Sequence, residues 1–267
     1  MTKGKSFLFW FLAFLITASS AIYQRMTGPT YPIDGKTSIN NNQITYKFLR
    51  SYSIKQDCPV EIKAGEANIT GTLHWRRYKF DKEFNQIEMT GTETLRAELP
   101  KQPPAGKLEY FVTLKSNNEE IKLPYKKNVV IRFKGDVPTW ILIPHVIAMF
   151  ASMLFAARAG FEYFSSNPKL KFYSLWTIGI LFIGGFILGP IMQKYAFGEF
   201  WTGFPFGYDL TDNKTLIAMI GWFVSYYRMN KSQHPKRWLL FAAIIMFIVY
   251  LIPHSVLGSE LDYSTLE

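Results

Sequence analysis

Long apolar segments are the feature of this sequence that most limits how the chain can fold. A helix needs about 20 mostly apolar residues to cross the hydrocarbon core of a membrane. The sequence approaches this length at residues 7–22, 140–157, 173–192, 216–227 and 238–252. The fourth segment is strictly apolar for only twelve residues, and to span it must include a preceding turn that contains Asp212 and Lys214. Charged groups at that depth are costly unless they are paired or hydrated. The fourth segment is therefore either a span with a polar entrance or a re-entrant piece. We expect a span, and five crossings in all, because the charges of the flanking loops require an even number of crossings between them.

The first segment, residues 7–22, has two interpretations. Lys3 and Lys5 precede it, and small residues end it, as in a cleaved secretory signal. Its length, and the tyrosines Tyr23 and Tyr31 at the expected interface, are more typical of a retained anchor. We expect residues 1–22 to form an N-terminal transmembrane anchor.

Basic residues gather in alternate connections between these segments. The N-terminus and the loops at 158–172 and 228–237 together hold nine Lys or Arg and one acid, Glu162. The loop at 193–214 and the C-terminal tail hold two Lys against six acids. Lys and Arg favour the cytoplasmic side, so we expect the N-terminus on the cytoplasmic side of a bacterial inner membrane. Residues 23–138 and the C-terminus are then periplasmic. This charge explains most of the net charge of +10 without a nucleic-acid partner.

Residues 23–138 have the pattern of short β-strands. Apolar and polar residues alternate, or the residues are typical of strands, at 44–48, 60–62, 72–78, 94–99, 108–114 and 129–133, with turn residues between most of them. About seven such strands without a helix between them predict a β-sandwich. The expected fold class is thus an α+β membrane protein. It comprises the anchor, an extracytoplasmic sandwich at 23–138, a four-helix transmembrane bundle at 139–255 and a periplasmic tail at 256–267.

Residues 96–110 resemble the region between strands E and F of fibronectin-III and immunoglobulin-like modules. A proline-rich turn, with Pro100, Pro103 and Pro104, precedes a strand that carries Tyr110. The resemblance implies a two-sheet sandwich in which this tyrosine points inward. Cys58 is the only cysteine, so the antibody-type disulfide is absent, and we expect Cys58 to be a small apolar core residue.

Histidines and acids converge at the expected outer ends of the helices. His145 lies near the start of the second segment, His254 follows the fifth, and the loop between the third and fourth holds Glu199, Asp209 and Asp212. Imidazoles with carboxylates suit a divalent metal such as zinc, manganese or iron. His145 and His254 are alternatively the axial ligands of a haem. A structural interpretation is favoured over both: the aspartates cap the fourth helix, and the histidines cap helix ends or meet water.

The sequence contains no catalytic motif with the context that it requires. Gly185 and Gly189 have the spacing that lets another helix approach closely, either within the chain or in a homo-oligomer. The function that we expect is that of a scaffold, assembly or interaction subunit. It would contact an envelope protein through the β-sandwich and the aromatic loop at 197–214. The alternative is a membrane enzyme or transporter that uses the metal or haem site.

Overall fold

The computed structural model describes residues 2–40, 42–65, 68–117, 119–253 and 258–265. The chain divides into two compact units. One unit is helical and comprises Met1–Pro29 and Val137–Gly258. The other, called the β-domain below, comprises Thr30–Asp136 and Ser259–Glu267. The β-domain therefore begins later than the predicted residue 23, because the first helix continues to Thr27.

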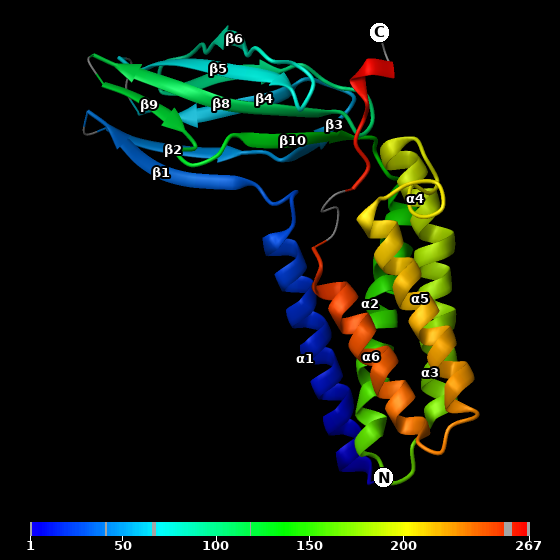
Figure 1. The fold of residues 1–267 in the computed structure, drawn as a ribbon. Coiled ribbons are helices and arrows are strands. Elements are labelled where there is room, and N and C mark those ends of the chain that lie inside the picture. Colours follow the sequence, from blue (N-terminus) through cyan, green and yellow to red (C-terminus); the bar gives the residue numbers. More distant parts are fainter. Residues whose placement is uncertain (1, 41, 66–67, 118, 254–257, 266–267) are drawn as a thin grey trace. The chain divides into compact units, whose positions relative to one another are not determined.

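The β-domain consists of two sheets (Figure 1). One sheet has the strand order β1-β2-β4-β7, formed by β1 (Ile33–Ile39), β2 (Asn42–Phe48), β4 (Cys58–Lys63) and β7 (Thr94–Leu99). The other has the order β3-β10-β8-β5-β6, with β9 also paired to β8; its strands are β3 (Ser51–Ser53), β5 (Thr70–Arg77), β6 (Asn85–Glu88), β8 (Lys107–Ser116), β9 (Glu119–Leu123) and β10 (Val129–Lys134). All pairs are antiparallel except β3 with β10.

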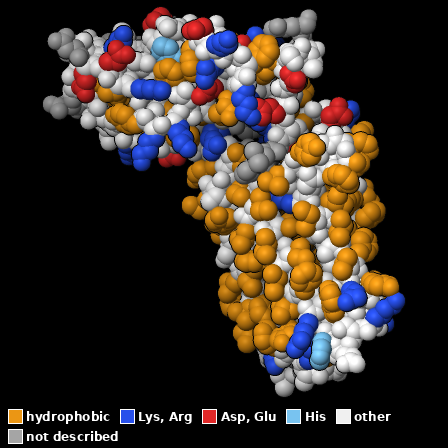
Figure 2. Space-filling view, in the orientation of Figure 1, with side chains coloured by type: hydrophobic (Ala, Val, Ile, Leu, Met, Phe, Trp, Pro, Cys, Tyr) orange, Lys and Arg blue, Asp and Glu red, His pale blue; other side chains and the backbone are white. Residues whose placement is uncertain are grey.

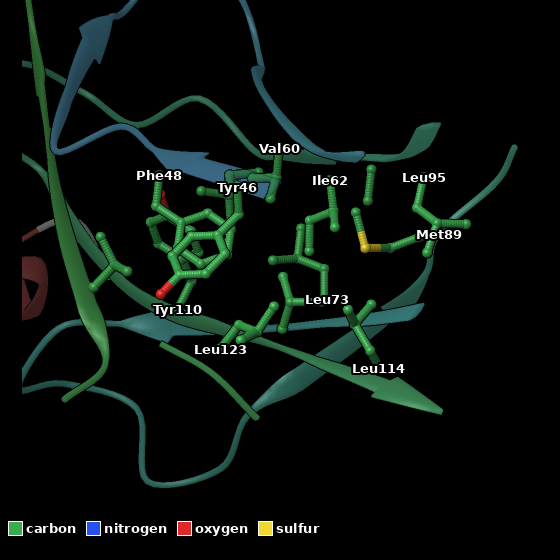
Figure 3. Close-up of a cluster of buried hydrophobic side chains, with 14 of the residues drawn as sticks. Tyr46, Phe48, Val60, Ile62, Leu73, Met89, Leu95, Tyr110, Leu114 and Leu123 are labelled. Carbon is green, nitrogen blue, oxygen red and sulfur yellow. The ribbon is translucent and has the colours of Figure 1, made fainter. Parts of the chain in front are cut away.

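A shared apolar core fills the β-domain, and both sheets contribute to it (Figure 3). In β8 every second side chain is buried, which is the period-two pattern that the sequence predicted. Tyr110 of β8 is fully buried, and its hydroxyl donates to the Leu49 carbonyl oxygen at 2.8 Å. The inward orientation expected for this tyrosine is confirmed. Cys58 is also buried in this core, as expected.

Six strands coincide with the predicted ones, and four were not predicted. Strands β6 and β9 carry mostly exposed polar side chains, and β1 has alternating half-buried and exposed residues. Strand β3 has only three residues. These strands pair through their backbones and bury little apolar surface, so they leave no strong hydrophobic pattern in the sequence.

The helical unit contains five long helical segments. Four of them are α1 (Lys3–Thr27), α2 (Thr139–Phe161), α5 (Leu210–Met229) and α6 (Pro235–Leu251). The remaining one, between α2 and α5, is a continuous helix made of α3 (Leu170–Leu181), a π-helical segment (Phe182–Leu188) and α4 (Gly189–Phe197). They run side by side and alternate in direction (Figure 1). Helices α2, α3, α5 and α6 share one buried apolar cluster.

Three helices in the described residues are long and apolar enough to cross a membrane: Lys3–Thr27, Thr139–Phe164 and Leu170–Phe197. Two of these lie after the β-domain, where four had been predicted. Helix α6 has only 17 residues. Helix α5 has 20, but its first turns contain Asp212 and Lys214.

A buried ion pair lies at the end of the helical unit where α2 finishes. Arg158 and Glu162 are 0% and 1% exposed, and Arg158 Nη1 donates to Glu162 Oε1 at 2.6 Å. The other carboxylate oxygen accepts the backbone N–H of Lys169 at 2.6 Å. Arg158 was expected in a cytoplasmic loop, but α2 extends past residue 157 and encloses it. Figure 2 shows several Lys and Arg side chains together at the lower end of the helical unit.

The π-helical segment brings α2 and α5 close to the third apolar helix. A Cβ atom on Gly185 would lie 2.6 Å from Thr215 Cγ2 of α5, so only glycine fits there. Gly189 faces the His145 ring of α2. Both glycines thus face neighbouring helices of the same chain, and a homo-oligomer through them stays a prediction.

Candidate functional site

The loop that joins α4 to α5, residues 198–209, carries two of the five predicted site residues, Glu199 and Asp209, and Asp212 follows in the first turn of α5. Gly198 ends α4 in a left-handed conformation with φ of 89°, and its N–H donates to the Lys194 carbonyl oxygen at 3.0 Å. Glycine adopts this conformation at little cost. The chain then turns back toward the first turn of α5, which begins at Leu210.

Two buried aspartates hold this loop. Asp209 is the N-cap of α5, and its Oδ1 accepts the backbone N–H of Thr211 at 2.7 Å. Asp212 Oδ2 accepts the backbone N–H of Thr202 at 2.7 Å. The Thr202 hydroxyl lies 3.2 Å from Asp209 Oδ2 and 3.3 Å from Asp212 Oδ2, so it can donate to either carboxylate. Burial of acidic side chains requires such donors, and the loop supplies them.

Two amides complete the network. Gln193 of α4 donates to Thr202 Oγ1 at 2.6 Å, and Asn213 Oδ1 accepts the backbone N–H of Phe204 at 2.7 Å. A Cβ atom on Gly203 would lie 2.6 Å from Asp212 Cβ, so glycine is required where the loop crosses α5. Thr202, Gln193 and Asn213 were not predicted as site residues. Uncharged side chains give no charge or metal-ligand signal in a sequence.

The aromatic residues of the loop divide into two kinds. Trp201 packs onto the ring of Phe186 with 5.6 Å between centroids, and its Nε1 donates to the Phe204 carbonyl oxygen. In contrast, four aromatic side chains are exposed: Phe200 at 55%, Phe204 at 68%, Phe206 at 82% and Tyr208 at 94%. The loop is thus fixed by one set of side chains and presents another outward.

Lys214 connects the first turn of α5 to the end of α6. Its side chain is buried, and Nζ donates to the Ile252 carbonyl oxygen at 2.8 Å. Carbonyl groups at a helix C-terminus lack intrahelical donors, and the helix dipole stabilises a cation placed there. The polar entrance predicted for the fourth segment is therefore used to join α5 to α6.

His145 is buried in α2. Its Nδ1 lies 3.0 Å from the Gly184 carbonyl oxygen in the π-helical segment. A carbonyl oxygen only accepts, so Nδ1 carries the proton. The Gly184 carbonyl also accepts the backbone N–H of Gly189, which is the i→i+5 bond of the π turn. His145 therefore caps an irregular stretch of the adjacent helix.

The predicted metal ligands have separate environments. Asp209 and Asp212 share the Thr202 hydroxyl, Glu199 is exposed, and the hydrogen bond of His145 is to a helix backbone. His254 lies outside the described residues. Among the residues that are described, no group of three or more His, Cys, Asp or Glu side chains is placed to hold a metal ion. A metal or haem site that includes His254 stays a prediction.

The polar groups of this region serve its internal contacts, and its outward groups are aromatic. The acids accept hydrogen bonds from the loop, the buried lysine joins two helices, and the exposed groups are aromatic rings. No protein-family model matches the chain, and no curated protein matches its sequence.

Proposed function

We propose that this protein is a multi-pass scaffold or assembly subunit of a bacterial inner membrane that holds an envelope protein through the loop at 198–209. One observation carries the proposal: four exposed aromatic side chains lie on a loop that buried Asp209 and Asp212 hold in place. Aromatic residues are enriched at protein interfaces. A loop fixed in advance loses little conformational entropy when it binds.

Exposed apolar side chains support five membrane crossings. Helix α5 exposes Ile217, Ile220 and Phe223, and α6 exposes Ile244, Phe247 and Ile248. The hydrophobic side chains continue along the helical unit in Figure 2. An apolar surface of this extent suits lipid better than water. At 1.5 Å per residue, α6 is about 26 Å long, slightly less than the hydrocarbon core, and modest bilayer thinning accommodates such a mismatch.

Two further observations support a periplasmic β-domain and C-terminus. The start of α1, the start of α3 and the start of α6 share one end of the helical unit (Figure 1), and basic residues lie there: Lys5, Lys169, Lys236 and Arg237. The positive-inside rule expects such residues on the cytoplasmic side. In addition, Ser259–Glu267 belongs to the same compact unit as Thr30–Asp136. This supports placing both segments on one side of the membrane, and four crossings by α2, Leu170–Phe197, α5 and α6 would bring the chain back to that side.

The strand arrangement supports the immunoglobulin-like interpretation of the β-domain. Strands β4 and β7 pair in one sheet, and β5, β8 and β10 are neighbours in the other. Constant-type immunoglobulin domains separate strands B and E from C, F and G in the same way. Such a domain positions or binds other molecules, which suits a scaffold, although fold alone does not assign function.

Site-specific photo-crosslinking in cells tests the proposal. A benzophenone amino acid replaces Tyr208 in the loop or, as a matched control, Tyr227, which is 57% exposed on the side of α5. We expect a discrete protein adduct from position 208 and none from 227, since position 227 would face lipid. The double substitution Phe204→Ser with Phe206→Ser should abolish the adduct and shift the protein to a smaller species on native gels, with unchanged abundance.

The opposite results would refute this function. Aromatic rings also anchor loops in the membrane interface without any partner. In that case, position 208 would give only lipid adducts, and the double substitution would leave the size of the native species unchanged.

A further inference from the structure

The C-terminal segment Ser259–Thr265 lies in the β-domain as an extended piece followed by a single turn. Leu261 donates its backbone N–H to the Ala105 carbonyl oxygen at 3.2 Å, and Arg132 donates to the Ser259 carbonyl oxygen. The turn Tyr263–Thr265 follows. Tyr263 is only 4% exposed, although it lies a few residues from the end of the described chain. The residues that surround this side chain, Arg77, Phe80, Gln102 and Lys107, are called the Tyr263 pocket below.

The hydroxyl of Tyr263 is hydrogen-bonded within this pocket. This hydroxyl lies 3.0 Å from Gln102 Oε1 and 3.1 Å from the Lys107 carbonyl oxygen. The Gln102 amide nitrogen donates to the carbonyl oxygens of Pro100 and Lys101, so its oxygen is turned toward the tyrosine. Burial raises the pKa of Tyr263 to about 12, which keeps its proton available for donation.

The ring of Tyr263 also has specific neighbours. The Arg77 guanidinium lies 5.5 Å from its centroid, and the Phe80 ring lies 5.8 Å away. Asp81 forms an ion pair with Arg77 and so orients the guanidinium. A Cβ atom on Gly106 would lie 3.0 Å from the Tyr263 hydroxyl, so the glycine lets the tyrosine approach the backbone.

A second subsite binds the carboxylate of Glu260. Glu260 Oε2 lies 3.1 Å from Lys107 Nζ and 3.2 Å from Lys79 Nζ. Burial alone would raise the pKa of Glu260, but the hydrogen bonds and charges of Lys107 and Lys79 together lower it. Burial lowers the pKa of Lys107, which means that this ammonium group benefits from a carboxylate beside it.

We propose that the β-domain contains a peptide-binding site for an extended segment with a carboxylate and a tyrosine three residues apart, and that Ser259–Thr265 is its resident ligand. Charge complementarity supports this: the segment has two acids and no Lys or Arg, whereas Arg77, Lys79, Lys107 and Arg132 surround it. Backbone hydrogen bonds contribute affinity, and the two side-chain subsites contribute specificity, as in other modes of peptide recognition.

Peptide binding to detergent-purified protein that keeps both compact units tests the proposal. The probe is a fluorescent peptide with the sequence of residues 259–265, blocked at both ends. The acceptor is the chain truncated after Gly258, with a Glu260→Gln/Tyr263→Ala full-length chain as a second acceptor that keeps the chain length. We expect both acceptors to bind the peptide. Wild-type protein should bind it at least about tenfold more weakly, because its own tail competes at high effective concentration.

Peptide variants test the two subsites. Tyr263→Ala in the peptide should weaken binding at least about tenfold, since a buried aromatic anchor is lost. Glu260→Gln should weaken binding about three- to tenfold and reduce its dependence on salt. Asp262→Asn is the matched control, because it removes the same charge from a side chain that hydrogen-bonds to Ser264 within the segment itself. It should change the affinity by less than about twofold.

Three outcomes would overturn the proposal. The first is no peptide binding by either acceptor when its thermal unfolding is still cooperative. The second is equal binding by wild type and both acceptors, which would place the peptide elsewhere. The third is equal affinity of the Tyr263→Ala, Glu260→Gln and Asp262→Asn peptides. None of these measurements involves the loop at 198–209, so they are independent of the proposed scaffold function.

Discussion

The carboxylate of Asp212 accepts the backbone N–H of Thr202 at 2.7 Å, which joins the first turn of α5 to the loop that precedes it. The same carboxylate is a candidate metal ligand by sequence pattern. In the structure its Oδ2 atom accepts from the backbone and hydroxyl of Thr202, and this fixes the backbone of the loop. The exposed aromatic rings of the loop depend on that fixed backbone for their orientation.

Replacing Asp212 with Ala should release the loop. The Thr202 N–H would lose its partner, and an unpaired buried donor costs about 1–3 kcal/mol. We expect a lower thermal midpoint in detergent and faster chymotrypsin cleavage after Phe206 and Tyr208. Asp212→Asn, which keeps one acceptor oxygen, should have a smaller effect.

Glu199→Gln is the matched control, because Glu199 is exposed in the same loop. It should leave both the midpoint and the cleavage rate unchanged. A result in which Asp212→Ala removed bound metal without changing the thermal midpoint would instead support a metal site.

Replacing Glu162 with Gln should destabilise the helical unit strongly. The Arg158 guanidinium would remain buried without its counter-charge, among the rings of Phe9, Trp10 and Tyr173. Breaking one side of a buried ion pair typically costs about 3–5 kcal/mol. Thermal unfolding monitored by circular dichroism measures the loss.

The double variant Arg158→Met with Glu162→Gln separates charge from packing. Removal of both charges should recover much of the lost stability, because no uncompensated ion remains. If the double variant were as unstable as Glu162→Gln alone, the loss would come from packing and the electrostatic explanation would be wrong.

Replacing His145 with Ala should destabilise the contact between α2 and the π-helical segment. The Gly184 carbonyl would lose a donor, for a cost of about 1–2 kcal/mol including the cavity. Asn at this position can still donate from its amide nitrogen, so His145→Asn should retain more stability than His145→Ala. The test is the protein level in membranes together with the thermal midpoint.

Elemental analysis of the same two preparations distinguishes capping from coordination. The metal content should be equal in wild type and both variants if His145 has only a structural role. A stoichiometric metal that disappeared with His145→Ala would refute this expectation.

The Cys58 thiol should make the β-domain less stable at high pH. Burial raises its pKa to about 12 in the folded chain, whereas an exposed thiol titrates near 8.5. The folded state therefore holds a proton that the unfolded state loses above about pH 9. Stability should fall there by up to about 1.4 kcal/mol per pH unit, and remain unaffected by this group at neutral pH.

Cys58→Ala removes this titration, so the difference between the variant and wild-type unfolding free energies should change with pH only above about pH 9. Other alkaline groups titrate in both proteins and cancel. A pH-independent difference would show that the thiol does not ionise on unfolding. Native Cys58 should also resist iodoacetamide at pH 8 and react only after denaturation.

Sequence reasoning was most successful where burial imposes a period. The alternation in β8 and the apolar lengths of α2 and of Leu170–Phe197 were predicted because side chains there must face a core or a lipid-like surface. It was less successful for edge strands such as β6 and β9, whose backbone pairing needs no apolar pattern. It also placed Arg158 in a loop, because its partner Glu162 counted only as a loop charge.

The candidate site was foreseen in its location and not in its connections. Asp209 and Asp212 were recognised as possible caps, and the structure bears out Asp209 as the N-cap of α5. Thr202 and Gln193 have no distinctive sequence signal, and the acceptor of Lys214 is a carbonyl 38 residues away. The π turn at Gly184 depends on tertiary contacts with His145, which no local pattern encodes.

The tail segment has a consequence for biosynthesis. Ribosomes make Thr30–Asp136 before α2, whereas Ser259–Thr265 follow α6 in the chain. The strands of the β-domain are therefore complete, with the Tyr263 pocket still open, before α2 to α6 have been translated. Closure of that pocket marks a molecule whose synthesis has passed α6.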